Sequence, residues 1–187
     1  MKLGNEPIEL DEIDLGILSI LQDNCRVSLA KIGEQVGLSP PSVIERVKKL
    51  EDNGVIRGYH AILDARRLGM DITAFIGVYV SHPRLIDRFE SDVHAMEDVL
   101  ECHHVTGEYT LLLKVKTANT SSLEALISRL RSIDGVEKTE TMVVLSTNTE
   151  RSQLRLGPVP SAGSRGDAPA IEKKARRNGA ARAKVAP

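Results

Sequence analysis

Aromatic side chains are scarce in this sequence, whose 187 residues include no Trp, three Tyr and two Phe. Proteins that bind single-stranded nucleic acid hold its bases by stacking them on aromatic rings. The composition therefore argues against that mode of binding. Cysteine is scarce as well, because Cys25 and Cys102 are the only two thiols. With no export signal at the N-terminus, they favour a reducing cytoplasm and no disulfide framework.

Long apolar runs and enzyme fingerprints are also missing. No apolar stretch reaches the length that spans a bilayer, so we expect no membrane partner. The sequence has no phosphate-binding loop, dinucleotide fingerprint or nucleophile elbow, and we expect neither a cofactor nor a catalytic residue. Cys102, His103 and His104 are consecutive, but on a strand they alternate between faces, and no paired metal-ligand motif accompanies them. We therefore expect no metal site.

Charge is distributed unevenly, although the formal net charge is only −1. Residues 151–187 hold nine Lys/Arg and two Asp/Glu, whereas the rest of the chain holds 16 Lys/Arg and 24 Asp/Glu. The end of this segment is rich in Pro, Gly, Ser and Ala and has too few apolar residues to build a core. We predict a basic disordered tail over 151–187. Any affinity for DNA then comes from local patches and from this tail.

The most informative stretch is residues 37–54, which has the marks of a helix with defined ends. Ser39 suits the N-cap, Pro40 suits the first helical position, and Gly54 can close the helix in a left-handed conformation. Between these ends, apolar and polar residues form two stripes at helical spacing: Val43, Val47 and Leu50 against Ser42, Arg46 and Lys49.

A shorter helix is predicted immediately before this one, over residues 28–36, and Gly37 ends it. Helix, short glycine-containing turn and helix are the helix-turn-helix arrangement. In that arrangement the second helix enters the major groove and the first crosses the backbone. A further helix over residues 11–22 supplies the third wall of the core. We therefore expect a helix-turn-helix DNA-binding domain over residues 1–54.

Strand formers follow over residues 55–64, interrupted by Gly58. We interpret residues 55–70 as a linker strand, either a wing that leads out of the DNA-binding unit or a strand that pairs with its copy in a second chain. Arg57 and His60 can reach phosphates from this strand, and solvated side chains on an edge strand are an equal alternative.

A second domain is predicted over residues 71–150. Strand periodicity covers 72–80, 99–106, 109–117 and 136–147, and helical periodicity covers 84–96 and a segment after Asn119, where Ser121 and Glu124 match a capping box. The order βαββαβ is that of the ferredoxin-like fold, and the fold class is α+β. Its helices cover one face of the sheet only, so we expect a second copy to cover the other.

Residues 9–150 resemble the Lrp/AsnC, or feast/famine, family of prokaryotic transcription regulators. The motifs that carry the resemblance are LSP at 38–40, ERVKKLE at 45–51, GVIRGY at 54–59, VLECH at 99–103, TGEY at 106–109 and LLLK at 111–114. The resemblance implies a winged helix-turn-helix joined to a ligand-sensing, RAM-type βαββαβ domain. It also implies a homodimer that can assemble into octamers, and binding to double-stranded DNA under the control of an amino acid or related metabolite.

Several side chains of the second helix are candidates for contacts with DNA. Arg46 is the best candidate for bidentate recognition of guanine, which is worth about 1–3 kcal/mol of discrimination. Ser39, Ser42 and Lys49 are better placed for phosphates, which set register rather than sequence. Lys48 is a further candidate for a contact with DNA.

In this family the effector sits between subunits, near the Gly-Glu turn. Carried over by position, the resemblance implies an effector site at Gly107, Glu108, Tyr109 and Thr110, with Thr120 and Met142 as further candidates. Many members place an Asp at the position of Thr110, where its carboxylate can pair with an ammonium group. Three alternatives stay open: Glu108 substitutes for that Asp, the ligand is not an ordinary α-amino acid, or the turn binds no effector.

Two other functions remain to be weighed. One is a nucleoid-organising protein that binds DNA broadly without an effector, which the basic tail favours. The other is a tetrapyrrole decarboxylase of the same fold that uses His103 or His104. The intact DNA-reading helix argues against the enzyme, and a cytoplasmic, nucleoid-associated regulator is expected.

Overall fold

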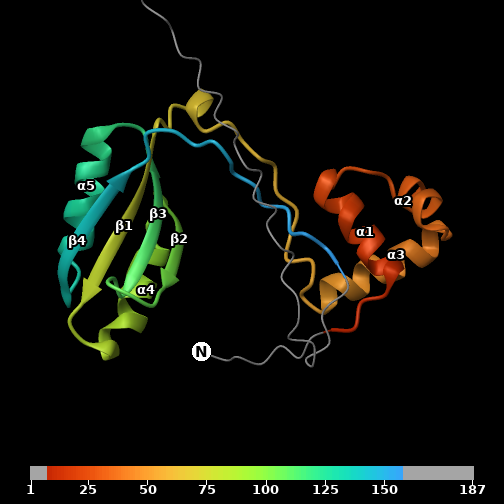
Figure 1. Ribbon diagram of the computed structural model, residues 1–187, viewed down its shortest axis with the longest axis horizontal. Coiled ribbons are helices and arrows are strands. Elements are labelled where there is room, and N and C mark those ends of the chain that lie inside the picture. Colours follow the sequence, from red (N-terminus) through yellow and green to blue (C-terminus); the bar gives the residue numbers. More distant parts are fainter. Residues whose placement is uncertain (1–7, 158–187) are drawn as a thin grey trace, which may run out of the picture.

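The computed structural model describes residues 8–157 and shows a helical lobe and a sheet lobe joined by two extended segments (Figure 1). The helical lobe contains α1 (Glu12–Asp23), α2 (Leu29–Val36) and α3 (Pro40–Asp52). Asp11, Ser28 and Ser39 cap these three helices. Gly37 ends α2 in the left-handed conformation, with φ at 73°, and this allows the sharp turn into α3. The predicted helix-turn-helix is confirmed.

The core of the helical lobe is small and entirely aliphatic. Its buried members are Ile17, Leu18, Ile32, Val43 and Leu50. Val47 is half-buried and packs against them, as the spacing of the α3 stripe predicts. Gly33 lies where a Cβ would come within 2.4 Å of the Leu38 carbonyl oxygen, so the close approach of α2 to the turn requires glycine.

Residues 55–71 do not form the strand predicted for the linker. They are extended without a strand partner, and a short 3-10 turn, Arg66–Leu68, interrupts them. A β-strand needs a neighbour to pair its backbone groups, and a single chain supplies none here. Ile62 and Leu63 are left 91% and 67% exposed.

The sheet lobe has the predicted order βαββαβ. Its elements are β1 (Ile72–Val80), α4 (Ile86–His94), β2 (Val99–His104), β3 (Leu111–Thr117), α5 (Thr120–Arg131) and β4 (Val136–Val143). The strands lie in the antiparallel order β2-β3-β1-β4. One local prediction was wrong: the capping box of α5 is formed by Asn119 and Ser122, because the helix begins two residues before the position that Ser121 and Glu124 would require.

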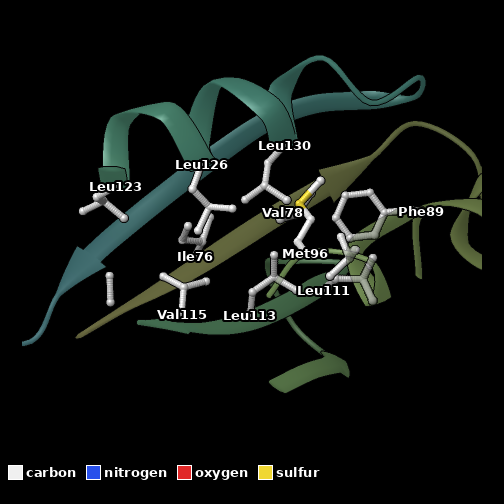
Figure 2. Packing of buried hydrophobic residues seen from close by; sticks show 12 residues of the cluster. Ile76, Val78, Phe89, Met96, Leu111, Leu113, Val115, Leu123, Leu126 and Leu130 are labelled. Atoms are coloured by element: carbon white, nitrogen blue, oxygen red, sulfur yellow. The ribbon is translucent and has the colours of Figure 1, made fainter. Parts of the chain in front are cut away.

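Figure 2 shows α5 lying across one face of the sheet, with its leucines pointing into the space above the strands. Ile76 and Val78 of β1 and Leu111 and Leu113 of β3 are fully buried there, beside Phe89 of α4. The opposite face of the sheet carries no helix among the described residues (Figure 1). Its side chains include Phe75, Tyr79 and Leu112, which are half-buried.

After β4 the chain returns to the helical lobe through residues 144–156, which we call the return segment (Figure 1). The Gln22 amide donates to the Leu154 carbonyl oxygen at 3.2 Å, and the Leu154 N–H donates back to Gln22 Oε1 at 2.7 Å. Gln153 Nε2 donates to Asp23 Oδ1 at 3.3 Å, and Leu156 packs against the helical core. The helical lobe is therefore connected to the sheet lobe twice, by the linker before β1 and by the return segment after β4.

Candidate nucleic-acid interface and ligand turn

The N-terminus of α3 is exposed and well capped. Ser39 Oγ accepts a hydrogen bond from the Ser42 N–H at 3.4 Å, and the two hydroxyl oxygens lie 2.9 Å apart. Pro40 removes one of the N–H groups that would otherwise lack a partner. The first turn of α3 is thus fixed without any contact that would prevent it from entering a groove.

Arg46 does not extend into solvent from α3. Its Nη1 donates to Asp11 Oδ2 at 2.6 Å and to Asp14 Oδ1 at 2.8 Å. Asp11 is the N-cap of α1 and Asp14 lies in its first turn, where its side chain is only 11% exposed. The backbone N–H of Asp14 and the guanidinium of Arg46 lower the pKa of Asp11, and the two carboxylates raise the pKa of Arg46. Arg46 therefore joins α3 to α1.

A different set of α3 residues points away from the lobe. Pro41, Ile44, Glu45 and Lys48 are all exposed, and their spacing of i, i+3, i+4 and i+7 places them on one face of the helix. We call these four residues the outer stripe. Within residues 8–157, neither Glu45 nor Lys48 forms a salt bridge.

Lys49 is also exposed, on the flank of α3 between the outer stripe and the side that faces α1. Ser42 and Arg46 share this flank. A rotation of 100° per residue from the buried Val43 and Leu50 places Pro41, Glu45 and Lys48 on the opposite side of α3. Ile44 and Lys49 lie on the two edges of that side.

The linker begins with a contact to the last turn of α3. The Tyr59 hydroxyl donates to Glu51 Oε1 at 2.9 Å. Burial and this carboxylate raise the pKa of Tyr59 to about 12. Arg57, two residues earlier, is exposed and follows the C-terminal end of α3.

The predicted ligand turn lies between β2 and β3. Gly107 has φ at 119°, a conformation that requires glycine. Thr110 is tied to the sheet, because its N–H donates to the Val78 carbonyl at 3.0 Å and its hydroxyl accepts from the Val80 N–H at 3.2 Å. The Thr110 side chain therefore supports β1 from the base of the turn. Glu108 is exposed and supplies a carboxylate at its tip.

Tyr109 leans from the turn over the uncovered face of the sheet. It lies on Gly77, where a Cβ would come within 2.4 Å of the Tyr109 ring. The Tyr79 ring meets it edge to face, with centroids 5.5 Å apart at 75°. Lys138 Nζ lies 4.9 Å from the centroid of the Tyr79 ring. Gly77, Tyr79 and Lys138 are parts of this site that the sequence analysis missed.

Burial and nearby carboxylates both act on these two tyrosines. Burial raises the pKa of both, and the nearby carboxylates of Glu108 and Glu140 raise it further. The Tyr79 hydroxyl oxygen is buried and has no hydrogen-bond partner among the described residues. The cluster of Tyr79, Tyr109 and Lys138 thus offers ring faces, a cation and a hydroxyl that is free to bond.

The structure does not bring Thr120 and Met142 to this turn. Thr120 is the first residue of α5 and follows the far end of β3, roughly 20 Å from the turn at about 3.3 Å per residue. Met142 pairs with Phe75, away from the end of the sheet where Tyr79 pairs with Lys138. Within one chain, only residues 107–110 of the predicted set are neighbours.

The histidine-rich strand offers no centre for a metal. His103 Nε2 lies 3.1 Å from Glu101 Oε2, and Lys114 Nζ donates to Glu101 Oε1 at 3.2 Å. Across residues 8–157, no three His, Cys, Asp or Glu side chains gather in a geometry for a metal ion. None of the helices in that same range has the length and apolarity to cross a membrane.

Comparison with known families divides the chain at the same place as the fold. Residues 10–57 match the family described as winged helix-turn-helix DNA-binding. Residues 73–154 match the family described as Lrp/AsnC ligand binding domain. The first match covers the helical lobe, and the second covers the sheet lobe and most of the return segment.

The similarity to individual relatives extends over nearly the whole length of each of them. The HTH-type transcriptional regulator FL11 of Pyrococcus abyssi is 36% identical over 147 residues, which cover 79% of this chain and 97% of that protein. The leucine-responsive regulatory protein of Escherichia coli is 34% identical over 149 residues, covering 78% and 91%. Among solved structures, a Neisseria meningitidis transcriptional regulator in complex with L-Met has a TM-score of 0.74 at 30% identity, covering 79% and 97%.

Proposed function

The chain belongs to the Lrp/AsnC family, and on this premise we propose that it is a sequence-specific DNA-binding transcriptional regulator whose DNA binding or assembly is controlled by an amino acid or a related small metabolite. The observation that carries the proposal is the capped α3, whose outer face is exposed and makes no contribution to the core. Relatives named as regulators support it, as does a relative solved with L-Met. A regulator rather than an enzyme follows from those relatives.

The proposed partner is double-stranded DNA. An α-helix fits the major groove of double-stranded DNA, and α3 presents an exposed N-terminal half with lysines one to two turns later. Ser39 and Ser42 at its N-terminus, together with Lys48, Lys49 and Arg57, supply contacts to phosphates, which fix the register of the helix. The protein therefore acts in the cytoplasm, associated with the nucleoid.

The active assembly is a homodimer, and dimers can associate into an octamer. Two surfaces support this. The uncovered face of the sheet presents Phe75 and Leu112, and the linker leaves Ile62 and Leu63 largely exposed. A second copy covers both, pairs the two linkers and presents two α3 helices to half-sites ~34 Å apart. Light scattering on the full chain tests this, and a monomer at micromolar concentration would refute it.

The effector occupies the turn at Gly107, Glu108, Tyr109 and Thr110. Because the Thr110 hydroxyl is uncharged and bonded to β1, the ammonium group of an amino acid pairs with Glu108 instead. Thr120 and Met142 lie too far away in the same chain, so they contribute only from another subunit.

A thermal-shift screen of the amino acids and their close analogues tests this site. A saturating ligand at 100 times its Kd adds about 2.7 kcal/mol to the free energy of unfolding. Glu108→Gln keeps the shape of the side chain and removes its charge, so this variant should abolish the thermal shift. No shift with any α-amino acid would refute control by that class of effector and favour the nucleoid-organising alternative.

The predicted tail spans residues 151–187, of which the first few belong to the return segment and bond to the helical lobe. Residues 158–187 lie outside the described part of the chain, and we propose that they add affinity for DNA regardless of sequence. Their excess of Lys and Arg supports this, as does the return segment, which delivers Leu156 to the core of the helical lobe. Each phosphate contact steepens the dependence of log affinity on log salt by about 0.9. Deletion of residues 158–187 should flatten that dependence, and an unchanged slope would show that the tail does not bind DNA.

A further inference from the structure

We infer that the outer stripe of α3 reads the bases, through Ile44 and Glu45, and that Arg46 positions the helix and reads none. The inference rests on the proposed function, because it assigns sequence recognition within it. It departs from the assignment that the motif suggests, in which the arginine reads guanine.

The exposed side chains of the outer stripe have the chemistry for this task. Ile44 is 49% exposed, although the remaining exposed positions of α3 beyond its two prolines are charged. In the major groove an apolar side chain recognises the methyl group of thymine, and a carboxylate accepts from the amino group of cytosine. Ile44 and Glu45 are adjacent and lie in the N-terminal half of α3, the half that contacts base edges. The expected half-site therefore contains neighbouring thymine and cytosine.

Arg46 is occupied elsewhere. A single nitrogen, Nη1, bridges the carboxylates of Asp11 and Asp14 at 2.6 and 2.8 Å. To read guanine, the guanidinium would have to leave both carboxylates, and the largely buried Asp14 would lose its cationic partner. The contact instead sets the angle of α3 against α1, and this determines how the outer stripe meets the groove.

The bridging geometry makes lysine the informative substitution. One ammonium group can replace one bridging nitrogen, so Arg46→Lys should keep the position of α3. Lysine also donates to both guanine acceptors, but as a point charge without the planar fork of arginine. An arginine that read guanine would therefore lose part of its discrimination at that base on replacement by lysine, and all of it, roughly 5- to 150-fold, on replacement by methionine.

The experiment is selection of binding sites from a randomised duplex library, with the full chain and single variants. Ile44→Ala should abolish a thymine preference in each half-site, and Glu45→Gln should abolish a cytosine preference and admit adenine, which glutamine can bind. Each lost preference corresponds to roughly 5- to 150-fold. Arg46→Lys should select the wild-type consensus. Glu12→Gln, an exposed position on α1, is the matched control and should also select it.

Two results would overturn the inference. One is a consensus that Ile44→Ala and Glu45→Gln leave unchanged. The other is loss of a guanine preference in Arg46→Lys. Arg46→Met, which removes the charge, should weaken binding to every sequence equally, and a changed consensus in that variant would count against a positioning role. A wild-type chain that selects no sequence would refute the proposed sequence-specific regulation itself.

Discussion

Substitution of Gly77 by Ala should displace Tyr109 and destabilise the sheet lobe. The new Cβ would lie 2.4, 2.5 and 2.7 Å from three atoms of the Tyr109 ring, so the ring has to move off the strand. Overpacking of this kind typically costs about 1–3 kcal/mol, and the edge-to-face contact with Tyr79 is lost with it. A cost of about 2 kcal/mol in a lobe of this size lowers its Tm by about 8–16 °C.

Whether Gly77→Ala lowers or raises the free energy of unfolding should depend on Tyr109. Away from the clash, alanine is favoured over glycine in a strand by roughly 0.5–1 kcal/mol. In a Tyr109→Ala background, Gly77→Ala should therefore stabilise the lobe, whereas in the wild-type background it destabilises it. Chemical denaturation of the four proteins of this cycle measures the coupling between the two positions.

Gly157→Ala is the matched control, because a Cβ at that position has no neighbour within 4 Å. It should leave the free energy of unfolding unchanged. Equal costs of Gly77→Ala in the two backgrounds would refute the packing of Tyr109 on the sheet. A Gly77→Ala variant that keeps the full thermal response to an effector would show that Tyr109 takes no part in the ligand turn.

Three further perturbations test other contacts. Asp14→Asn removes the buried carboxylate beside the α3 guanidinium and should destabilise the helical lobe by about 1–3 kcal/mol, measured by urea denaturation. The pKa of Tyr59, Tyr79 and Tyr109 is raised in each case, so absorbance of tyrosinate should appear only above pH 10. Folding favours the neutral phenols, so their contribution to stability is complete below pH 10 and is lost at higher pH, for Tyr59 as the pH rises towards its pKa of about 12. Leu156→Ala should release the return segment, seen as faster hydrogen exchange in α1.

The sequence was sufficient to predict the elements, because local signals determine them. Ser39, Pro40 and the left-handed glycines define the ends of α2 and α3, and alternation over residues 72–80 predicts β1 with the bounds observed. The α5 capping box was misplaced by two residues, since Asn119 and Ser121 are both good caps. Only the register of the helix on the sheet selects Asn119.

Contacts between distant parts of the chain could not be predicted. Arg46 has the same local pattern whether it faces DNA or the first turn of α1, and only the packing of the two helices decides between these. The Tyr109 ring reaches Gly77 because the turn folds back over the sheet, and a turn motif does not specify that direction. The linker strand failed for a different reason, because strand-forming residues do not specify a partner and residues 55–71 have none among the described residues.

The bonds between Gln22 and Leu154 join residues 132 positions apart, so they convert most of the chain into a closed ring. Closing so large a ring costs more conformational entropy than forming any local turn, and contacts of this separation form late in folding. During synthesis, the three helices emerge first, but they cannot bond to the return segment until that segment and the last strand have left the ribosome. A truncated chain that ends before residue 153 therefore carries a DNA-reading helix on a lobe without its second anchor.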